Sequence, residues 1–150
     1  MTARLVFNIM AICGAATFAG AMLNIGLSFG AYWKSLAPAD FLDWFGANGQ
    51  FIGRTIPLFA IPTLIGLAGS LWLDWTMPAA RWLWLASLAA LAGIAVITFA
   101  WHLPTNAAFA ARSVPVAEVP ATLDLWLRLH AVRIALGLTS AVLGLVAISR

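Results

Sequence analysis

Four long apolar runs constrain the fold of this chain more than any other feature. They cover residues 5–29, 52–73, 83–101 and 125–148. A helix that crosses the hydrocarbon core of a bilayer needs about 20 mostly apolar residues. Of the 150 residues 63% are hydrophobic and 9% are charged, whereas soluble domains have about 45–50% apolar and about 25% charged residues. The sequence therefore predicts an all-α, integral membrane four-helix transmembrane bundle, a single domain with the lipid bilayer as its solvent.

The tryptophans support this four-span topology. Trp side chains prefer the membrane–water interface. Four of the eight lie around the short connection between the second and third spans, and four lie on the opposite side, namely Trp33, Trp44, Trp101 and Trp126. We expect a polar connection at 34–50 and a long irregular one at 102–122, with Pro104 ending the third helix because proline disrupts a helix interior.

Most polar side chains within the spans fall on one side of the bilayer when the spans alternate in direction. Ionisable groups inside a membrane are costly and often mark function. This polar set predicts a functional site. Its members are Asn24, Trp33, Asp43, Arg54, His102, Asn106, His130 and Arg133.

The fourth span carries the strongest motif of this set. Trp126, His130 and Arg133 are spaced four and three residues apart, so they share one helical face. Arg133 lies about two turns inside its span and keeps its proton under all ordinary conditions, so it needs a counter-ion or a wet cavity. The candidate counter-ions are Asp40, Asp43, Glu118 and Asp124.

Histidine suits proton transfer near neutral pH. We therefore predict His130, Arg133 and His102 as catalytic residues. The predicted substrate-binding residues are Asn24, Arg54, Asn106, Trp126 and Trp33.

Three other interpretations stay open on the residues alone. His102 and His130 could ligate a metal, with Asp43 or Asp124 as a third ligand, or a haem between the helices of the bundle. No short-range ligand spacing or haem-attachment motif accompanies them. The polar set could instead be a structural network in a non-enzymatic protein, either a small-molecule binder or a subunit of a membrane complex. A nucleic-acid partner is not indicated, because the chain has no basic stripe.

Small residues four apart recur in all four spans. The pairs are Ala16 and Gly20, Gly66 and Ser70, Ala89 and Gly93, and Gly137 and Ala141. Such spacing lets helix backbones approach closely in lipid. These faces are available for packing within the bundle or for a homo-oligomer.

Three short motifs resemble those of the anthrone oxygenase–like membrane proteins. They are Leu23-Asn24 late in the first span, Pro104-Thr105-Asn106 after the third, and Trp126 through Arg133 in the fourth. The resemblance covers nearly the whole chain, including the four-span layout, and predicts an integral protein of a bacterial inner membrane.

The resemblance implies oxidation of a flat phenolic, anthrone-type molecule by dioxygen as co-substrate, without an evident cofactor. On this hypothesis a neutral His130 or His102 removes the acidic ring-methylene proton. Arg133, Arg54 and Asn106 then stabilise the oxyanion, because fixed donors act strongly in a pocket of low dielectric. Trp33, Trp44 and Trp126 are expected to supply aromatic walls for the flat substrate.

Overall fold

The computed structural model describes residues 2–54 and 56–150. Every regular element within them is helical. In chain order these are α1 (Ala3–Asn24), the π-helical segment η1 (Ile25–Phe29), α2 (Gly30–Ser35), α3 (Pro38–Ile52), α4 (Ile56–Leu73), α5 (Pro78–Ile97), the π-helical segment η2 (Thr98–His102), α6 (Leu103–Ala110), the short 3₁₀ helix η3 (Val116–Glu118) and α7 (Val119–Ala147).

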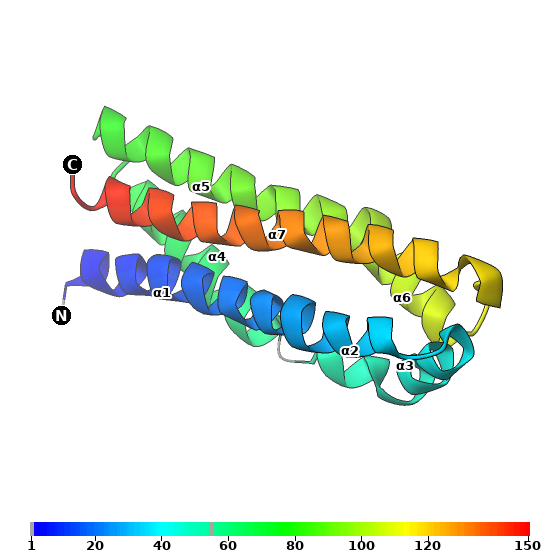
Figure 1. Ribbon diagram of the computed structural model, residues 1–150. Helices are drawn as coiled ribbons and strands as arrows, with labels where there is room; N and C mark the ends of the chain where they lie inside the picture. The colour runs from blue at the N-terminus through cyan, green and yellow to red at the C-terminus, as the bar shows by residue number, and fades with distance from the viewer. Residues whose placement is uncertain (1, 55) are drawn as a thin grey trace.

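The long helices form an elongated antiparallel bundle (Figure 1). Helix α1 packs against both α4 and α7, and α7 packs in turn against α5. Both chain ends and the α4–α5 connection lie at one end of the bundle, which we call the terminal end. Helices α2, α3 and α6 lie toward the other end (Figure 1).

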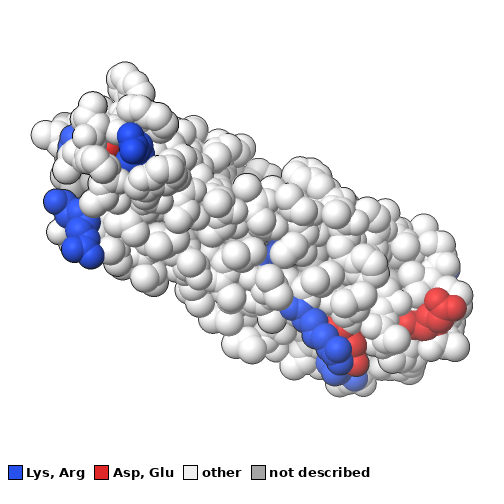
Figure 2. All heavy atoms as spheres, turned by 90° about the horizontal axis from the view of Figure 1, so that it is seen from above, with Lys and Arg blue, Asp and Glu red and all other residues white. Residues whose placement is uncertain are grey.

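Four helical stretches among the described residues are long and apolar enough to cross a membrane. They cover Ala3–Ser35, Ile56–Leu73, Pro78–Ala110 and Val116–Ala147. On the face shown in Figure 2 the charged side chains gather toward the two ends, and only a small blue patch lies between them. This pattern fits a membrane protein, because charges are kept out of hydrocarbon. The predicted fold class, an integral membrane four-helix bundle, is confirmed.

Three of the four membrane-spanning stretches are longer than the apolar runs predict, and the second is shorter. Ala3–Ser35 and Pro78–Ala110 each have 33 residues, a length of about 50 Å. Residues 34–50, expected to be a polar connection, contain most of α3, and the helix of the second span begins at Ile56 rather than 52. Most of the expected irregular stretch 102–122 is also helical.

Proline explains these differences. The prediction that Pro104 ends the third helix is wrong, because α6 continues after η2 with Pro104 in its first turn. The wider π-helical turn makes room where a regular turn would press a carbonyl group against the proline ring. Pro38, Pro78 and Pro120 likewise stand at helix starts, where a fixed φ angle and a missing N–H are tolerated.

Several of the small residues pack inside the bundle. A Cβ atom at Gly66 would overlap the backbone of Ala11, and one at Gly137 would lie 3.1 Å from the Cβ of Ala19. A Cβ atom at Gly20, in contrast, would meet nothing within 4 Å. The close approaches of α1 to α4 and α7 therefore depend on glycine, and a homo-oligomer through small-residue faces stays a prediction.

Candidate functional site

Two histidines, a tryptophan and an arginine form a buried cluster between η2 and α7. His102 is 1% exposed, His130 is 1% exposed and Arg133 is 6% exposed. Their rings lie close together, with 4.6 Å between the centroids of His102 and Trp126 and 5.9 Å between those of the two histidines. We call His102, Trp126, His130 and Arg133 the buried cluster.

Both ring nitrogens of His130 are engaged. Nε2–H donates to the carbonyl oxygen of Met22 at 2.7 Å, and Nδ1 accepts from Nη1 of Arg133 at 3.4 Å. This arrangement defines a neutral imidazole protonated on Nε2. Gly26 brings the first span against the ring, since a Cβ atom there would lie 3.2 Å from Cδ2 of His130. His130 is therefore held in place from two sides and has no free lone pair.

Arg133 is the middle residue of α7, with 14 residues of the helix before it and 14 after it. It lies deeper in its span than the sequence predicts. The ion pairs among the described residues join Arg4 to Asp74, Lys34 to Asp124, and Arg112 to Asp43. None of them involves Arg133, and its Nε is buried without a hydrogen-bond partner in the described part of the chain. A buried guanidinium whose hydrogen-bond acceptor is a neutral ring is well suited to receive an anion.

The acids predicted as counter-ions form no ion pair with Arg133 in the described part of the chain. Asp43 is exposed and Asp124 is half-buried, and they pair with Arg112 and Lys34. Asp40 and Glu118 are exposed and take part in no ion pair over residues 2–54 and 56–150. That part of the sequence interpretation is wrong, because lying on one side of the bilayer does not turn a side chain toward the interior.

His102 has a free nitrogen. Its Nδ1 lies 3.4 Å from the carbonyl oxygen of Ile97, to which it donates when protonated. Its Nε2 is buried and has no hydrogen-bond partner among the described residues. With the proton on Nδ1, the lone pair on Nε2 is available, so His102 is the better placed of the two histidines to accept a proton.

Aromatic rings and one amide complete the surroundings of the cluster. Trp126 stacks on His130 with 4.8 Å between ring centroids, and its Nε1 donates to Oδ1 of Asn106 at 2.8 Å. Trp33 of α2 meets Trp126 edge to face at 5.5 Å. The structure thus brings together six of the eight predicted site residues, with Asn106 and Trp33 next to the buried cluster.

Of the other two predicted residues, Asn24 lies at a separate cavity between α1, α3 and α4, and Arg54 lies next to a residue that lines it. This α1–α3–α4 cavity has a volume of about 450 Å³. Asn24 lines it, and the guanidinium of Arg54 lies 5.6 Å from the ring centre of Phe51, another lining residue. The polar and aromatic side chains of its lining are Asn24, Phe29, Trp44, Asn48, Phe51 and Phe59, and the remaining ones are aliphatic.

Sequence reasoning missed Asn48 as a residue of this cavity, and it predicted Trp44 as an aromatic wall of the substrate site without placing it here. They are four residues apart on α3, a spacing that places two side chains on one helical face. The apolar-run criterion predicts a connection over residues 34–50, and helical spacing has no meaning within a connection.

The donor set does not fit a metal ion between the histidines. A metal-bound histidine needs one ring nitrogen with a free lone pair, whereas both nitrogens of His130 are engaged. Asp43 and Asp124, the expected third ligands, pair with basic residues elsewhere. Among the described residues there is also no group of three or more His, Cys, Asp or Glu side chains able to hold a metal.

The fold and the buried cluster define a class of protein: an integral membrane four-helix bundle with a His–Trp–Arg centre inside it. A family model described as Anthrone oxygenase matches residues 44–143, which is 100 of the 150 residues. The chain belongs to the anthrone oxygenase family, as the sequence motifs predict. The matched region contains the whole buried cluster. No curated protein and no solved structure matches the chain.

Proposed function

We propose that this protein is a membrane-embedded oxygenase that oxidises a flat phenolic, anthrone-type molecule with dioxygen at the buried cluster. The observation that carries the proposal is Arg133, a guanidinium 6% exposed in the middle of a membrane-spanning helix and without an acidic partner among the described residues. Membership of the anthrone oxygenase family supports the same reaction class. A purely structural network would be expected to pair a charge so deep in the bundle.

The two basic side chains have separate roles in this proposal. His102 Nε2 accepts the proton of the ring methylene, because it is the unpaired imidazole nitrogen of the cluster. Arg133 stabilises the oxyanion that forms when the negative charge moves from the deprotonated carbon onto the ketone oxygen of the substrate. His130 orients Arg133 and is itself oriented by the carbonyl of Met22. His130 is therefore a positioning residue rather than the base.

The overall reaction balances with dioxygen alone. The methylene carbon loses two hydrogens and becomes a carbonyl carbon. One oxygen atom of dioxygen becomes that carbonyl oxygen, and the other leaves as water with the two hydrogens. The carbanion formed by proton removal is the electron-rich species that reacts with dioxygen, so the protein has to supply the base, the oxyanion contact and a site that excludes bulk water.

The test uses the full chain in nanodiscs with 1,8-dihydroxyanthrone as substrate. Anthraquinone formation is followed by visible absorption and oxygen uptake by an electrode, against empty nanodiscs that report spontaneous oxidation. We expect one dioxygen consumed per anthraquinone formed. A rate no higher than that of empty nanodiscs would sink the proposal.

One variant tests the role of His102 as the base, and a second variant is its control. His102→Ala is expected to lower the rate by about 10²-fold or more, the usual value of a general base. Ser87→Ala is the matched control. Its hydroxyl bonds to the carbonyl and hydroxyl of Ser140 between α5 and α7, away from the cluster, so its rate per folded protein should equal that of the parent.

A further inference from the structure

The α1–α3–α4 cavity has the features of a small-molecule site separate from the buried cluster. Its volume of about 450 Å³ falls within the range of about 300–1,000 Å³ typical of ligand pockets. Four aromatic side chains contribute to its walls, from η1, α3 and α4: Phe29, Trp44, Phe51 and Phe59. Walls of this kind suit a flat ring system, because aromatic rings pack well in offset or edge-to-face contact.

Two amides give this cavity a defined polarity. Ser28 Oγ donates to Oδ1 of Asn24 at 3.1 Å, and Nδ2 of Asn48 donates to the carbonyl of Trp44 at 3.0 Å. Neither amide makes another hydrogen bond in the described part of the chain. The free groups are then the Nδ2 donor of Asn24 and the Oδ1 acceptor of Asn48. A flat molecule that carries both a ketone and a phenolic hydroxyl would satisfy both.

Two other cavities differ from it in polarity or in size. One, of about 510 Å³ between α4 and α5, is lined by apolar side chains and by Thr98, whose hydroxyl already donates to the carbonyl of Ile94. The other, of about 200 Å³, is small and has the ion-paired Lys34 and Asp124 in its lining. Of the two cavities lined by amide or charged side chains, the α1–α3–α4 cavity is the one with room for a flat ring system, at about 450 Å³ against about 200 Å³.

The cavity is joined to the buried cluster through two sets of contacts. Ile25, which lines the cavity, belongs to η1, next to Gly26 on the ring of His130. On α3, the ring of Trp44 lies 5.6 Å from that of Trp33, which in turn meets Trp126. One helical segment and one layer of aromatic rings therefore separate the cavity from the cluster.

We propose that the α1–α3–α4 cavity is a reception site, where a flat phenolic ketone dissolved in the bilayer binds before it reaches the buried cluster. The substrate class rests on the proposed function, whereas the location rests on the aromatic walls and the two amides. Trp44 and Phe59 hold the ring system, Asn24 donates to its ketone, and Asn48 accepts from its hydroxyl. Arg54, over Phe51, lies where it can attract the same molecule in its phenolate form.

Binding is measured with 1,8-dihydroxyanthraquinone, which is not turned over, on the full chain in nanodiscs. Its saturable binding above that of empty nanodiscs is read from quenching of tryptophan fluorescence. We expect the double variant Asn24→Leu with Asn48→Leu to raise the Kd about tenfold, the worth of two hydrogen bonds. Trp44→Leu is expected to raise it by a similar factor.

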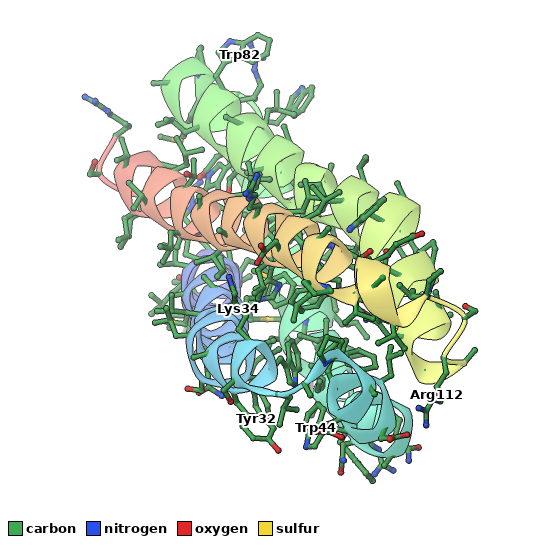
Figure 3. All side chains as sticks on the ribbon, turned by 45° about the vertical axis from the view of Figure 1, so that its right-hand side comes forward. Tyr32, Lys34, Trp44, Trp82 and Arg112 are labelled. Carbon is green, nitrogen blue, oxygen red and sulfur yellow. The ribbon has the colours of Figure 1, made fainter. Side chains whose placement is uncertain are left out.

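The matched control is Trp82→Leu. Trp82 is exposed and lies far from Trp44, across the molecule in Figure 3. The Trp82→Leu substitution removes one tryptophan from the fluorescence signal without changing the cavity. The Kd of this variant should therefore match that of the parent. Far-UV circular dichroism and a single elution peak show that each variant is folded.

The outcomes separate this inference from the proposed function. An unchanged Kd in the folded double variant, or no saturable binding at all, would overturn the reception site. Weakened binding in the cavity variants, with His102→Ala binding like the parent, supports it. If the parent binds the quinone in this way but does not oxidise 1,8-dihydroxyanthrone, the proposed function fails and the reception site stands.

Discussion

Two buried ionisable side chains, Asp74 at the terminal end and Arg133 in the middle of α7, have opposite surroundings. Asp74 is 4% exposed, forms an ion pair with Arg4 at 2.9 Å, and accepts a hydrogen bond from Nε1 of Trp84 at 2.9 Å. It ties the start of α1 to the α4–α5 connection and to α5. Arg133 has a neutral histidine as its acceptor and an unpaired Nε in the described part of the chain.

This difference indicates that Asp74 contributes to stability and Arg133 to function. A buried charge with well-placed partners keeps the structure together, and removing one partner is strongly destabilising. A buried charge without a counter-ion gains little for the fold, because its desolvation is not offset by pairing. The ion pair at the terminal end thus stabilises the bundle, whereas the buried cluster contains a positive charge that is available to bind a ligand.

The largest expected effect is on turnover in Arg133→Leu. Loss of an oxyanion donor lowers kcat by about 10²- to 10³-fold, while the free energy of unfolding should change by no more than about 1 kcal/mol, since an apolar residue replaces a charge that lacks a counter-ion. Oxidation of 1,8-dihydroxyanthrone and thermal unfolding in detergent give the two values. A variant that oxidises like the parent would remove the distinction between the two regions.

The second effect concerns the packing of α1 against α4. Gly66→Ala should lower the free energy of unfolding by about 3 kcal/mol or more. The added methyl group would overlap the backbone of Ala11, which cannot move aside as a side chain can, so α1 and α4 must separate. Gly20→Ala is the control, because nothing lies within 4 Å of its added Cβ. Equal thermal stability of the two variants would contradict the close approach of α1 and α4.

The third prediction divides the contacts of Asp74. Asp74→Leu removes the ion pair and the acceptor of Trp84, and we expect a loss of about 2–3 kcal/mol in unfolding free energy. Asp74→Asn keeps a side-chain oxygen for Nε1 of Trp84 and should lose only about 1 kcal/mol, because Arg4 is half exposed and its pairing is partly screened. In both variants, turnover per folded protein should equal that of the parent; a selective loss of turnover would argue against a purely structural role for Asp74.

The sequence predicts this fold well because its main signals are local. Apolar runs of membrane-spanning length identify the four spans, and the spacing of Trp126, His130 and Arg133 places them on one helical face without knowledge of the neighbours. All three are buried in the structure. Helix ends were predicted less well, since the same proline can stop a helix or begin one, as Pro104 shows.

The candidate site was only partly predictable for a different reason. Membrane side and depth can be counted along a helix, but the face that meets another helix depends on packing. The sequence predicts Asn24 and Arg54 on the same side of the bilayer as the buried cluster, yet Asn24 lines the α1–α3–α4 cavity and Arg54 lies over Phe51 beside it. The hydrogen bond from His130 to the carbonyl of Met22 joins residues 108 positions apart, and no sequence motif indicates it.

The smallest expected effect, in Gly26→Ala, tests whether the buried cluster depends on the close approach of the first span. The added Cβ would lie 3.2 Å from Cδ2 of His130 and 3.3 Å from Cδ1 of Ile134. Both neighbours are side chains that can yield, and alanine also favours a helix over glycine by about 0.5–1 kcal/mol, so the free energy of unfolding should stay within about 1 kcal/mol of that of the parent.

Turnover in Gly26→Ala should fall a few-fold, because the shifted ring weakens the hydrogen bond to Met22 that orients His130 and, through it, Arg133. Gly20→Ala, in the same helical stretch Ala3–Ser35 but with open space around its Cβ, should leave the rate unchanged. If Gly26→Ala also oxidises 1,8-dihydroxyanthrone at the parent rate, the orientation of His130 by the first span is not part of the mechanism.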